Sequence, residues 1–493
     1  MNRDRFTRLS AQDAAAVVKD GNTVGFSGFT AAGSPKAVPR AIADFAKAEH
    51  AANKNFKIRV IAGASTGASL DEALAQAEAI SWRTPFQASP TLRKQINNQQ
   101  VEFIDMHLSH VPQSIEFGFI GKIDVAVIEA TDITADGRVY LSASGGISPS
   151  LLRHADKIII ELNEYHSKRL CEMHDVAILP TPPHREAIHI FHPMERIGTP
   201  FAWVDPKKIV GIVETNEADG ISEFSESNEA CLKIAQHVVR FLVDETKAGR
   251  VPESLLPLQG GVGNISNAVF GGIGQCDDIQ PFHMYTEVFQ DTLLDLMESG
   301  RMLGASTCSL TLSDDKLRKM YDNMDYFAPR LVIRPQELSN NPGVIRRLGV
   351  ISINAVLEVD MYGCANSTHV CGTHMMNGVG GSGDFVRNAY LSILVTPSVA
   401  KGGKISAIVP MVSHVDHNEH SLQIVVTEQG LADLRGLGPI ERAKCIINNC
   451  AHPDYRDYLF RYMENSRMGH LRHDLGKVFE LHENLLRNGQ MLP

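Results

Sequence analysis

The chain has 493 residues, which is too many for one ordinary hydrophobic core and enough for two large domains. Its apolar content of 43% and charged content of 21% are typical of a soluble globular enzyme and exclude a disordered chain. The formal net charge of −10 argues against nucleic acid and anionic membranes as partners. It does not exclude a small anionic ligand, because local basic groups and backbone amides decide such sites.

The N-terminal stretch is polar and charged, without the apolar segment of a signal peptide, and no apolar run approaches the ~20 residues that span a bilayer. The eight cysteines are dispersed and form no C-x-x-C pair, which predicts reduced, buried thiols in a reducing compartment. We therefore expect a cytoplasmic protein without a membrane partner.

The first half alternates buried strands with helices, which predicts an open, mostly parallel α/β sheet. Helices are expected in "SPKAVPRAIADFAKAEH" (34–50) and "SPSLLRHA" (148–155), each with Ser-Pro at a helix start. The expected strands are 22–28, 57–63, 123–130, 157–162 and 208–215.

The polar, acidic segment 215–230 is the candidate linker, and a helix is expected after it at 231–249. The second half contains further strands at 330–335, 404–412 and 421–428, less regularly separated by helices, so it is expected to include mixed sheets. We predict two open α/β domains, 1–225 and 226–493, which face each other across a cleft.

Two glycine-rich loops are candidate ligand sites. In "GGVGNISNAV" (260–269), Gly261 and Gly263 precede an expected helix, but Ser266 replaces the third glycine of a dinucleotide fingerprint. In "MNGVGGSGDF" (376–385), four glycines within six residues predict unusual dihedrals, and their amides suit an anion nest or an oxyanion hole. A purely structural turn remains the alternative for both loops.

Two polar clusters invite a metal interpretation, which we do not favour. "HVDHNEH" (414–420) would bring its histidines to one side only as a helix, yet it lies between two expected strands and is read as a polar loop. "CANSTHVCGTH" (364–374) lacks a recognised ligand spacing. We predict no metal site, with a metal-dependent hydrolase kept as the outside alternative.

Glu287 lies in "MYTEVFQDTLLDLMESG", where an expected strand gives way to a stretch with the spacing of an amphipathic helix. Such junctions open onto the crevice where α/β proteins bind ligands. A carboxylate there can act as a base or as a nucleophile, and a helix starting beside it would stabilise the anion by ~0.3–1 kcal/mol. The residues by themselves do not choose between the two roles.

Several motifs in fixed order resemble the acetyl-CoA hydrolase/transferase family of class I CoA-transferases. They include "GVGNISNAV", "YTEVFQD", "RPQELSNNPGVIRRLG", "NSTHVCGTHMMNGVGGSGDF", "PSVAKGGKISAIVPMV" and "VVTEQGLADLRGL", and with "GFSGFTAAGSPKAVPRAI" and "SWRTPFQASPTLRKQIN" they cover essentially the whole chain. The similarity is greatest to the propionyl-CoA:succinate and succinyl-CoA:acetate branch.

The resemblance implies that Glu287, in the C-terminal domain, is the nucleophile that forms an acyl-glutamyl anhydride and then a glutamyl-CoA thioester. It implies an oxyanion hole made by Asn340 and backbone amides, one of them that of Gly381. The implied CoA contacts are Gly261, Val262, Gly263, Asn264, Ile265, Asn377, Gly381 and Lys401, and Glu428 is placed near the site.

Acyl-CoA and short-chain carboxylates are therefore the expected substrates, with no permanently bound cofactor, and a homodimer is the expected assembly. The alternatives are a short-chain acyl-CoA hydrolase and a non-catalytic acyl-CoA-binding protein. One departure concerns 215–228, which holds no arginine where some relatives carry basic residues for the CoA phosphates. It leaves open how the nucleotide end of CoA is held.

Overall fold

The computed structural model describes residues 5–221 and 228–492, and the chain forms two compact units. Unit 1 comprises Met1–Glu223, Met284–Asp295 and Leu303–Val344, and unit 2 comprises Phe224–His283, Leu296–Met302 and Ile345–Pro493. The units are therefore not continuous halves, and Glu287 belongs to unit 1. The predicted domain boundary at 225/226 falls outside the described residues and stays a prediction.

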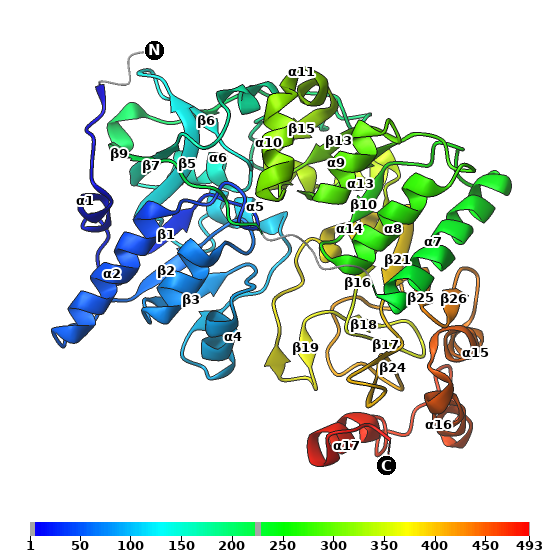
Figure 1. The fold of residues 1–493 in the computed structure, drawn as a ribbon. Helices are drawn as coiled ribbons and strands as arrows, with labels where there is room; N and C mark the ends of the chain where they lie inside the picture. Colours follow the sequence, from blue (N-terminus) through cyan, green and yellow to red (C-terminus); the bar gives the residue numbers. More distant parts are fainter. Residues whose placement is uncertain (1–4, 222–227, 493) are drawn as a thin grey trace. The chain divides into compact units, whose positions relative to one another are not determined.

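The main sheet of unit 1 is mostly parallel, as the sequence predicts. Strands β4-β3-β2-β1-β5-β6-β8 follow one another, while β7 pairs with β5 and β9. Figure 1 shows the central strands β1, β5 and β7 of this sheet. Only the pairings of β6 with β5 and β8 are antiparallel. The strands are β1 Thr23–Phe26, β2 Ile58–Ile61, β3 Ile80–Thr84, β4 Glu102–Phe103, β5 Val125–Ile133, β6 Arg138–Leu141, β7 Lys157–Asn163, β8 Ala202–Trp203 and β9 Ile209–Thr215.

All five strands expected in the first half are confirmed, because continuous apolar runs mark strands covered on both faces. The helices of this part are α1 Ala11–Ala15, α2 Ala37–Ala51, α3 Ala73–Gln76, α4 Pro90–Asn97, α5 His110–Glu116 and α6 Ser148–His154. The first turn of α2 is held from β7, where the buried Glu161 carboxylate accepts the backbone N–H groups of Lys36, Ala37 and Val38.

The rest of unit 1 holds the segments around Glu287. Strand β12 pairs with β14 and strand β13 with β15, both in parallel. The elements of this part of the chain are β11 Phe282–Tyr285, β12 Val288–Phe289, α9 Asp291–Glu298, β13 Met302–Thr307, β14 Ser309–Leu310, α10 Asp314–Asp322, α11 Met324–Phe327, β15 Leu331–Ile333, α12 Gln336–Ser339 and α13 Pro342–Leu348.

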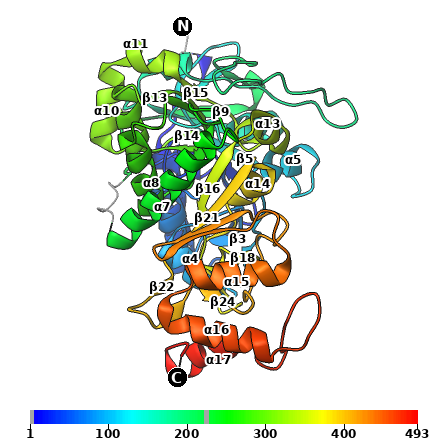
Figure 2. The same ribbon diagram turned by 90° about the vertical axis from the view of Figure 1, so that its right-hand side faces the viewer.

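Unit 2 contains the parallel run β10-β16-β21-β25, closed by β26, which is antiparallel to β25. Helices α7 and α8 pack together (Figure 1), and Figure 2 shows α15 to α17 in orange and red. These elements are α7 Glu229–Lys247, β10 Leu258–Gly260, α8 Asn264–Gln275, β16 Ile351–Ala355, α14 Ser382–Asn388, β21 Leu391–Val395, β25 Ile424–Thr427, β26 Gly430–Asp433, α15 Pro439–Cys450, α16 Pro453–Asn465 and α17 Glu480–Asn488.

Short strands complete unit 2 and confirm the expected mixed sheets: β17 Glu358–Asp360, β18 Ala365–Asn366, β19 His369–Val370, β20 His374–Met375, β22 Val399–Ala400, β23 Ile405–Ser406 and β24 Ile408–Val409. The single strand predicted at 404–412 is wrong. The chain breaks it at Ala407, whose N–H donates to Ser398 O, so that β23 pairs with β22 and β24 with β17.

The cysteine prediction holds in part. All eight cysteines are free thiols, but only Cys231, Cys308 and Cys450 are buried. Within residues 5–221 and 228–492, no helix has the length and apolarity needed to cross a membrane.

Candidate active site

Glu287 is a buried residue of unit 1, only 8% exposed, on the two-residue connection between β11 and β12. Its backbone carbonyl accepts three hydrogen bonds, from Cys308 N (2.9 Å), Ser309 N (3.1 Å) and Thr307 Oγ1 (3.0 Å). A buried carbonyl with this many donors is fixed in place. The backbone that carries the carboxylate is therefore held by the end of β13 and the start of β14.

The predicted strand-to-helix junction at Glu287 is only partly right. The strand ends at Tyr285 as expected, but a short strand, β12, intervenes, and α9 begins at Asp291. Because the field of a helix end falls off within its first turn, the expected stabilisation of Glu287 by this helix is not supported. The apolar "VF" after the glutamate is the signal for the extra strand.

Asn340 contacts Glu287 in unit 1, while its expected role in an oxyanion hole stays a prediction. It follows α12 directly and is fully buried, and its Nδ2 donates to Glu287 Oε2 at 2.8 Å. Its Oδ1 accepts from Ser339 Oγ at 2.8 Å, which fixes the orientation of the amide so that the N–H side faces the glutamate. The pair gives a buried carboxylate beside a preoriented donor.

The first glycine-rich loop borders a cavity of about 190 Å³ in unit 2. Gly261, Val262, Gly263, Asn264 and Ile265 line it, together with Ser266 and with Ile353, Ala355 and Val395 from strands β16 and β21. Gly263 has φ +127°, a conformation that strongly favours glycine, and it immediately precedes α8. Five of the predicted CoA contacts thus gather at one cavity beside a helix start, which is a common setting for anionic groups.

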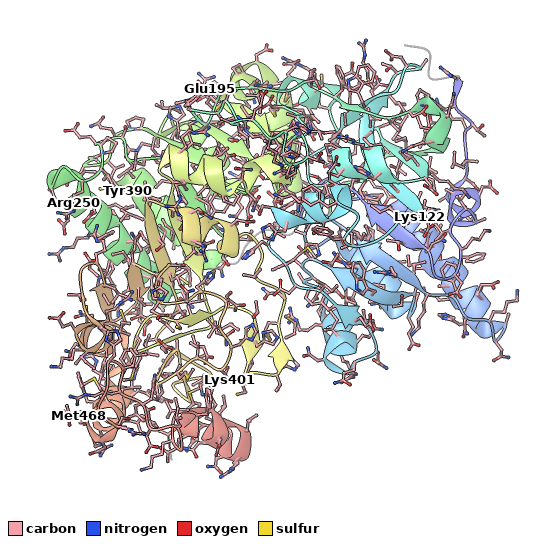
Figure 3. The ribbon with its side chains drawn as sticks, turned by 180° about the vertical axis from the view of Figure 1, so that it is seen from behind. Lys122, Glu195, Arg250, Tyr390, Lys401 and Met468 are labelled. Atoms are coloured by element: carbon pink, nitrogen blue, oxygen red, sulfur yellow. The ribbon has the colours of Figure 1, made fainter. Side chains whose placement is uncertain are left out.

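The second glycine-rich loop has the unusual dihedrals that its composition predicts. Gly378 has φ +144° and Gly380 φ +58°, and Asn377 Oδ1 accepts from Gly378 N at 2.9 Å. Gly381 directly precedes α14. Lys401, labelled in Figure 3, is exposed on the turn after β22 and has φ +49°.

Glu428 is half-buried and holds a neighbouring loop of unit 2. Its carboxylate accepts the N–H (2.7 Å) and the hydroxyl of Ser398, as well as Gln429 Nε2 (3.0 Å). Burial acts to raise the pKa of Glu428, but these hydrogen bonds outweigh it and lower the pKa below its ordinary value. Gly381, Asn377, Lys401 and Glu428 belong to unit 2, and their meeting with Glu287 at one site stays a prediction.

The polar loop expected at 414–420 is confirmed: these residues form bends and a turn and not a helix. Their side chains contact different partners, since His417 lies 3.2 Å from Ser382 Oγ and Asp416 accepts from Thr368 Oγ1 at 2.9 Å. The one described group with metal-ligand spacing is Glu129, His166 and Asp219 in unit 1. Lys36 Nζ already lies 2.5 Å from Glu129 Oε2 and 2.7 Å from Asp219 Oδ1.

Sequence reasoning missed this group and the donors to the Glu287 carbonyl. Asp219 lies in the segment read as a linker, yet it is buried, and residues 222–227 of that segment are outside the described residues. Thr307, Cys308 and Ser309 carried no motif, because they act mainly through the backbone. A buried acidic residue within a polar segment has no periodic signal that would identify it.

Comparisons with known proteins identify the family of this chain. Profiles of the acetyl-CoA hydrolase/transferase N-terminal and C-terminal domains match residues 1–214 and 317–463. The propanoyl-CoA:succinate CoA transferase of Escherichia coli (strain K12) is 55% identical over 99% of both chains. An acetyl-CoA hydrolase of Schizosaccharomyces pombe is 43% identical, over 99% of this chain and 96% of its own. The crystal structure of RipA from Yersinia pestis shares the fold, with TM-score 0.71 and 23% identity, over 93% of this chain and 96% of that one.

The chain therefore belongs to the acetyl-CoA hydrolase/transferase family, as its motifs indicated. It is an enzyme of the CoA-transferase type with a mixed α/β fold.

Proposed function

We propose that this enzyme moves CoA between short-chain acyl groups, with propionyl-CoA and succinate as the first pair to test, through a glutamyl-CoA thioester on Glu287. The observation that carries the proposal is the buried contact of Asn340 Nδ2 with Glu287 Oε2 at 2.8 Å. It places a hydrogen-bond donor directly beside the proposed nucleophile, where the donor can stabilise the negative charge that develops in the transition state. The similarity to a propanoyl-CoA:succinate CoA transferase supports the choice of substrates.

The chemistry divides into two reversible exchanges. The Glu287 carboxylate attacks the thioester carbonyl of acyl-CoA, a C–O bond forms, the C–S bond breaks, and an acyl-glutamyl anhydride and CoA thiolate result. The thiolate then attacks the glutamyl carbonyl, releases the first carboxylate and leaves the glutamyl-CoA thioester. The incoming acid reverses both steps. No net proton is taken up or released, and the thioester is preserved in the enzyme.

Each tetrahedral intermediate needs donors at its oxyanion. Asn340 Nδ2 is one such donor, and it is preoriented because Ser339 Oγ occupies the Oδ1 side of the same amide. We assign the backbone amide of Gly381 as the second. We also propose that the loop Gly261–Ile265, Asn377 and Lys401 contact CoA, and that Glu428 lies near the active site. The cavity that Gly261–Ile265 line supports the role of this loop in CoA binding.

A hydrolase is the second candidate, supported by the 43% identity to an acetyl-CoA hydrolase. The two functions differ only in whether water reaches the acyl-enzyme. We further propose that the protein is cytoplasmic and forms a homodimer, an assembly that sedimentation of the purified protein would test. We also propose that it carries no bound cofactor or metal, and metal analysis would test the latter.

The deciding experiment mixes the enzyme with propionyl-CoA, with and without succinate or acetate, and follows both thiol release and new acyl-CoA. We expect new acyl-CoA only with the acid present and no net thiol. Intact mass should show Glu287-dependent addition of CoA, absent in Glu287→Ala. Equal thiol release without any acid would establish a hydrolase, and a fully active Glu287→Ala variant would overturn the mechanism.

A further inference from the structure

Four ionisable side chains of unit 1 form a buried group that we call the charge cluster: Lys36, Glu129, His166 and Asp219. All four side chains are at most 4% exposed. Lys36 Nζ donates to Glu129 Oε2 at 2.5 Å and to Asp219 Oδ1 at 2.7 Å. His166 Nε2 lies 3.3 Å from Glu129 Oε1 and 3.4 Å from Asp219 Oδ1, and its Nδ1 meets Tyr321 OH at 2.8 Å.

The charge cluster is balanced, with two cations and two carboxylates. Burial alone would lower the pKa of His166, but Asp219 and Glu129 raise it to about 9, so the ring is charged at neutral pH. The same carboxylates raise the pKa of Lys36 above its ordinary value despite its burial. The ammonium of Lys36 therefore lies between Glu129 and Asp219, in the position that a metal ion bound by these carboxylates would occupy.

The charge cluster reaches two segments that follow strands of the main sheet. Asp219 Oδ1 accepts from Gly33 N at 3.3 Å, and Glu129 Oε1 accepts from Ser142 Oγ at 2.6 Å. Glu129 lies in β5 and pairs with Glu161 of β7. Strands β5 and β7 are neighbours in the main sheet (Figure 1), so the charge cluster is anchored near the centre of the sheet. It thus ties the loop Gly28–Ser34 and the segment Ser142–Gly146 to the central strands of unit 1.

The loop Gly28–Ser34 has little freedom besides these contacts. Gly28 and Gly33 have φ +111° and +68°, and Ser27 Oγ donates to Gly33 O at 2.9 Å. A Cβ at Gly33 would come within 2.5 Å of Ser144 Oγ. The loop and the segment Ser142–Gly146 are therefore packed directly on each other, and both depend on the charge cluster.

These two segments in turn hold residues 308–311. Gly145 N donates to Cys308 O (2.9 Å), Leu310 N donates to Ala143 O (2.9 Å), and Ser144 bridges to Ser309. The loop contributes Thr30 Oγ1, which lies 2.7 Å from Thr311 Oγ1. It also contributes Phe29, which packs with Val288 and Cys308 in one apolar cluster.

Residues 307–309 hold the backbone carbonyl of Glu287, so contacts run without interruption from the sheet to the glutamate. We propose that the charge cluster is a positioning device, which fixes Glu287 for attack through the Gly28–Ser34 loop and the Ser142–Gly146 segment. The inference rests on the proposed role of Glu287 as the nucleophile. Because an error of about 1 Å in a reacting group can cost ~100-fold in rate, the expected signature is a loss of rate and not of CoA binding.

The first test uses Ser142→Ala, which removes one link and leaves all four charges in place. Glu129 keeps Lys36 and Asn163 Nδ2 (3.0 Å) as partners, so we expect the variant to fold. We expect glutamyl-CoA formation in a single turnover with saturating propionyl-CoA to slow by about 10-fold, with KM changed by less than about 3-fold. Lys36→Met, which unbalances the cluster, should slow it by about 100-fold, measured well below its melting temperature.

His482→Gln is the matched control, because it alters another buried contact with a carboxylate, His482 Nε2 to Glu358 Oε2 (2.8 Å), in unit 2. It should lower the melting temperature and leave the single-turnover rate unchanged. If Ser142→Ala and Lys36→Met also lose only stability, the positioning role is wrong. A Glu287→Ala variant that still turns over would overturn the proposed function instead, so the two failures are told apart.

Discussion

At the residue scale, the site depends on the single amide of Asn340. We expect Asn340→Ala to lower kcat with propionyl-CoA and succinate by roughly 100- to 1000-fold, because an oxyanion donor is lost that acts mainly in the transition state. KM should change little. Steady-state kinetics and the single-turnover rate of glutamyl-CoA formation check this prediction.

Ser339→Ala provides the graded comparison. It removes the hydroxyl that donates to Asn340 Oδ1 but keeps the Nδ2 donor, so the amide is present and less well oriented. We expect a loss of about 10-fold or less. If Asn340→Ala costs no more than Ser339→Ala, Asn340 serves to orient the glutamate and does not stabilise an oxyanion.

At the element scale, α7 is fastened to the segment after β26 by a carboxylate with two arginine partners. Glu245 is buried, accepts from Arg435 Nη1 and Nη2 at 2.9 and 2.8 Å, and also pairs with Arg250. Hydrogen bonds from Arg435 and Arg250 lower the pKa of Glu245 to about 2. Arg250 O in turn accepts from Tyr390 OH at 2.9 Å, and both residues are labelled in Figure 3.

We therefore expect Arg435→Met to destabilise unit 2 by about 2–3 kcal/mol, since Glu245 loses a bidentate partner and stays buried. Arg435→Lys should recover only part of this, because an ammonium cannot reproduce the two parallel hydrogen bonds. Amide hydrogen exchange of peptides from α7 is the measurement. Unchanged exchange in Arg435→Met would mean that apolar packing alone holds the helix.

Elements with a continuous apolar run or a capped amphipathic pattern could be predicted from the sequence. One example is strand β5, which is buried at all nine positions. Another is helix α7, whose N-cap Asn228 accepts a hydrogen bond from Cys231 N through its side chain. The prediction failed where tertiary pairing decided the outcome. Strand β12 exists because β14 lies beside it, and 404–412 divides because its halves pair with different strands.

The candidate site was predictable only in part, for a related reason. Glu287 and Asn340 lie 53 residues apart in sequence, and family motifs, not spacing, marked both as candidate site residues; the contact between them is seen only in the structure. The charge cluster joins Lys36, Glu129, His166 and Asp219 across more than 180 residues, with no pattern that marks these side chains as partners. Long-range polar contacts leave no periodicity, so only the folded chain reveals them.

At the scale of the whole molecule, we expect two buried histidines with opposite pKa shifts to bound the pH range of stability. Burial lowers the pKa of His174 from 6.5 to about 4, whereas the neighbouring carboxylates outweigh burial and raise that of His166 to about 9. Between pH 6.5 and 4 only the unfolded chain binds a proton at His174, so stability falls as the pH falls. Between pH 6.5 and 9 only the folded chain keeps the proton on His166, so stability falls as the pH rises.

We expect the melting temperature to be highest near pH 6.5 and to decline on both sides, with His174 contributing at most roughly 3 kcal/mol to the acid limb. His174→Gln keeps a donor for Ser142 O, the acceptor of His174 Nε2 at 2.8 Å, and should flatten only the acid limb between pH 6.5 and 4. His166→Gln should lower the maximum and flatten only the alkaline limb. Melting temperatures of the unmodified protein and of both variants, measured from pH 4 to 10, test this prediction. If the dependence of melting temperature on pH is the same in both variants as in the unmodified protein, other groups set the pH range of stability.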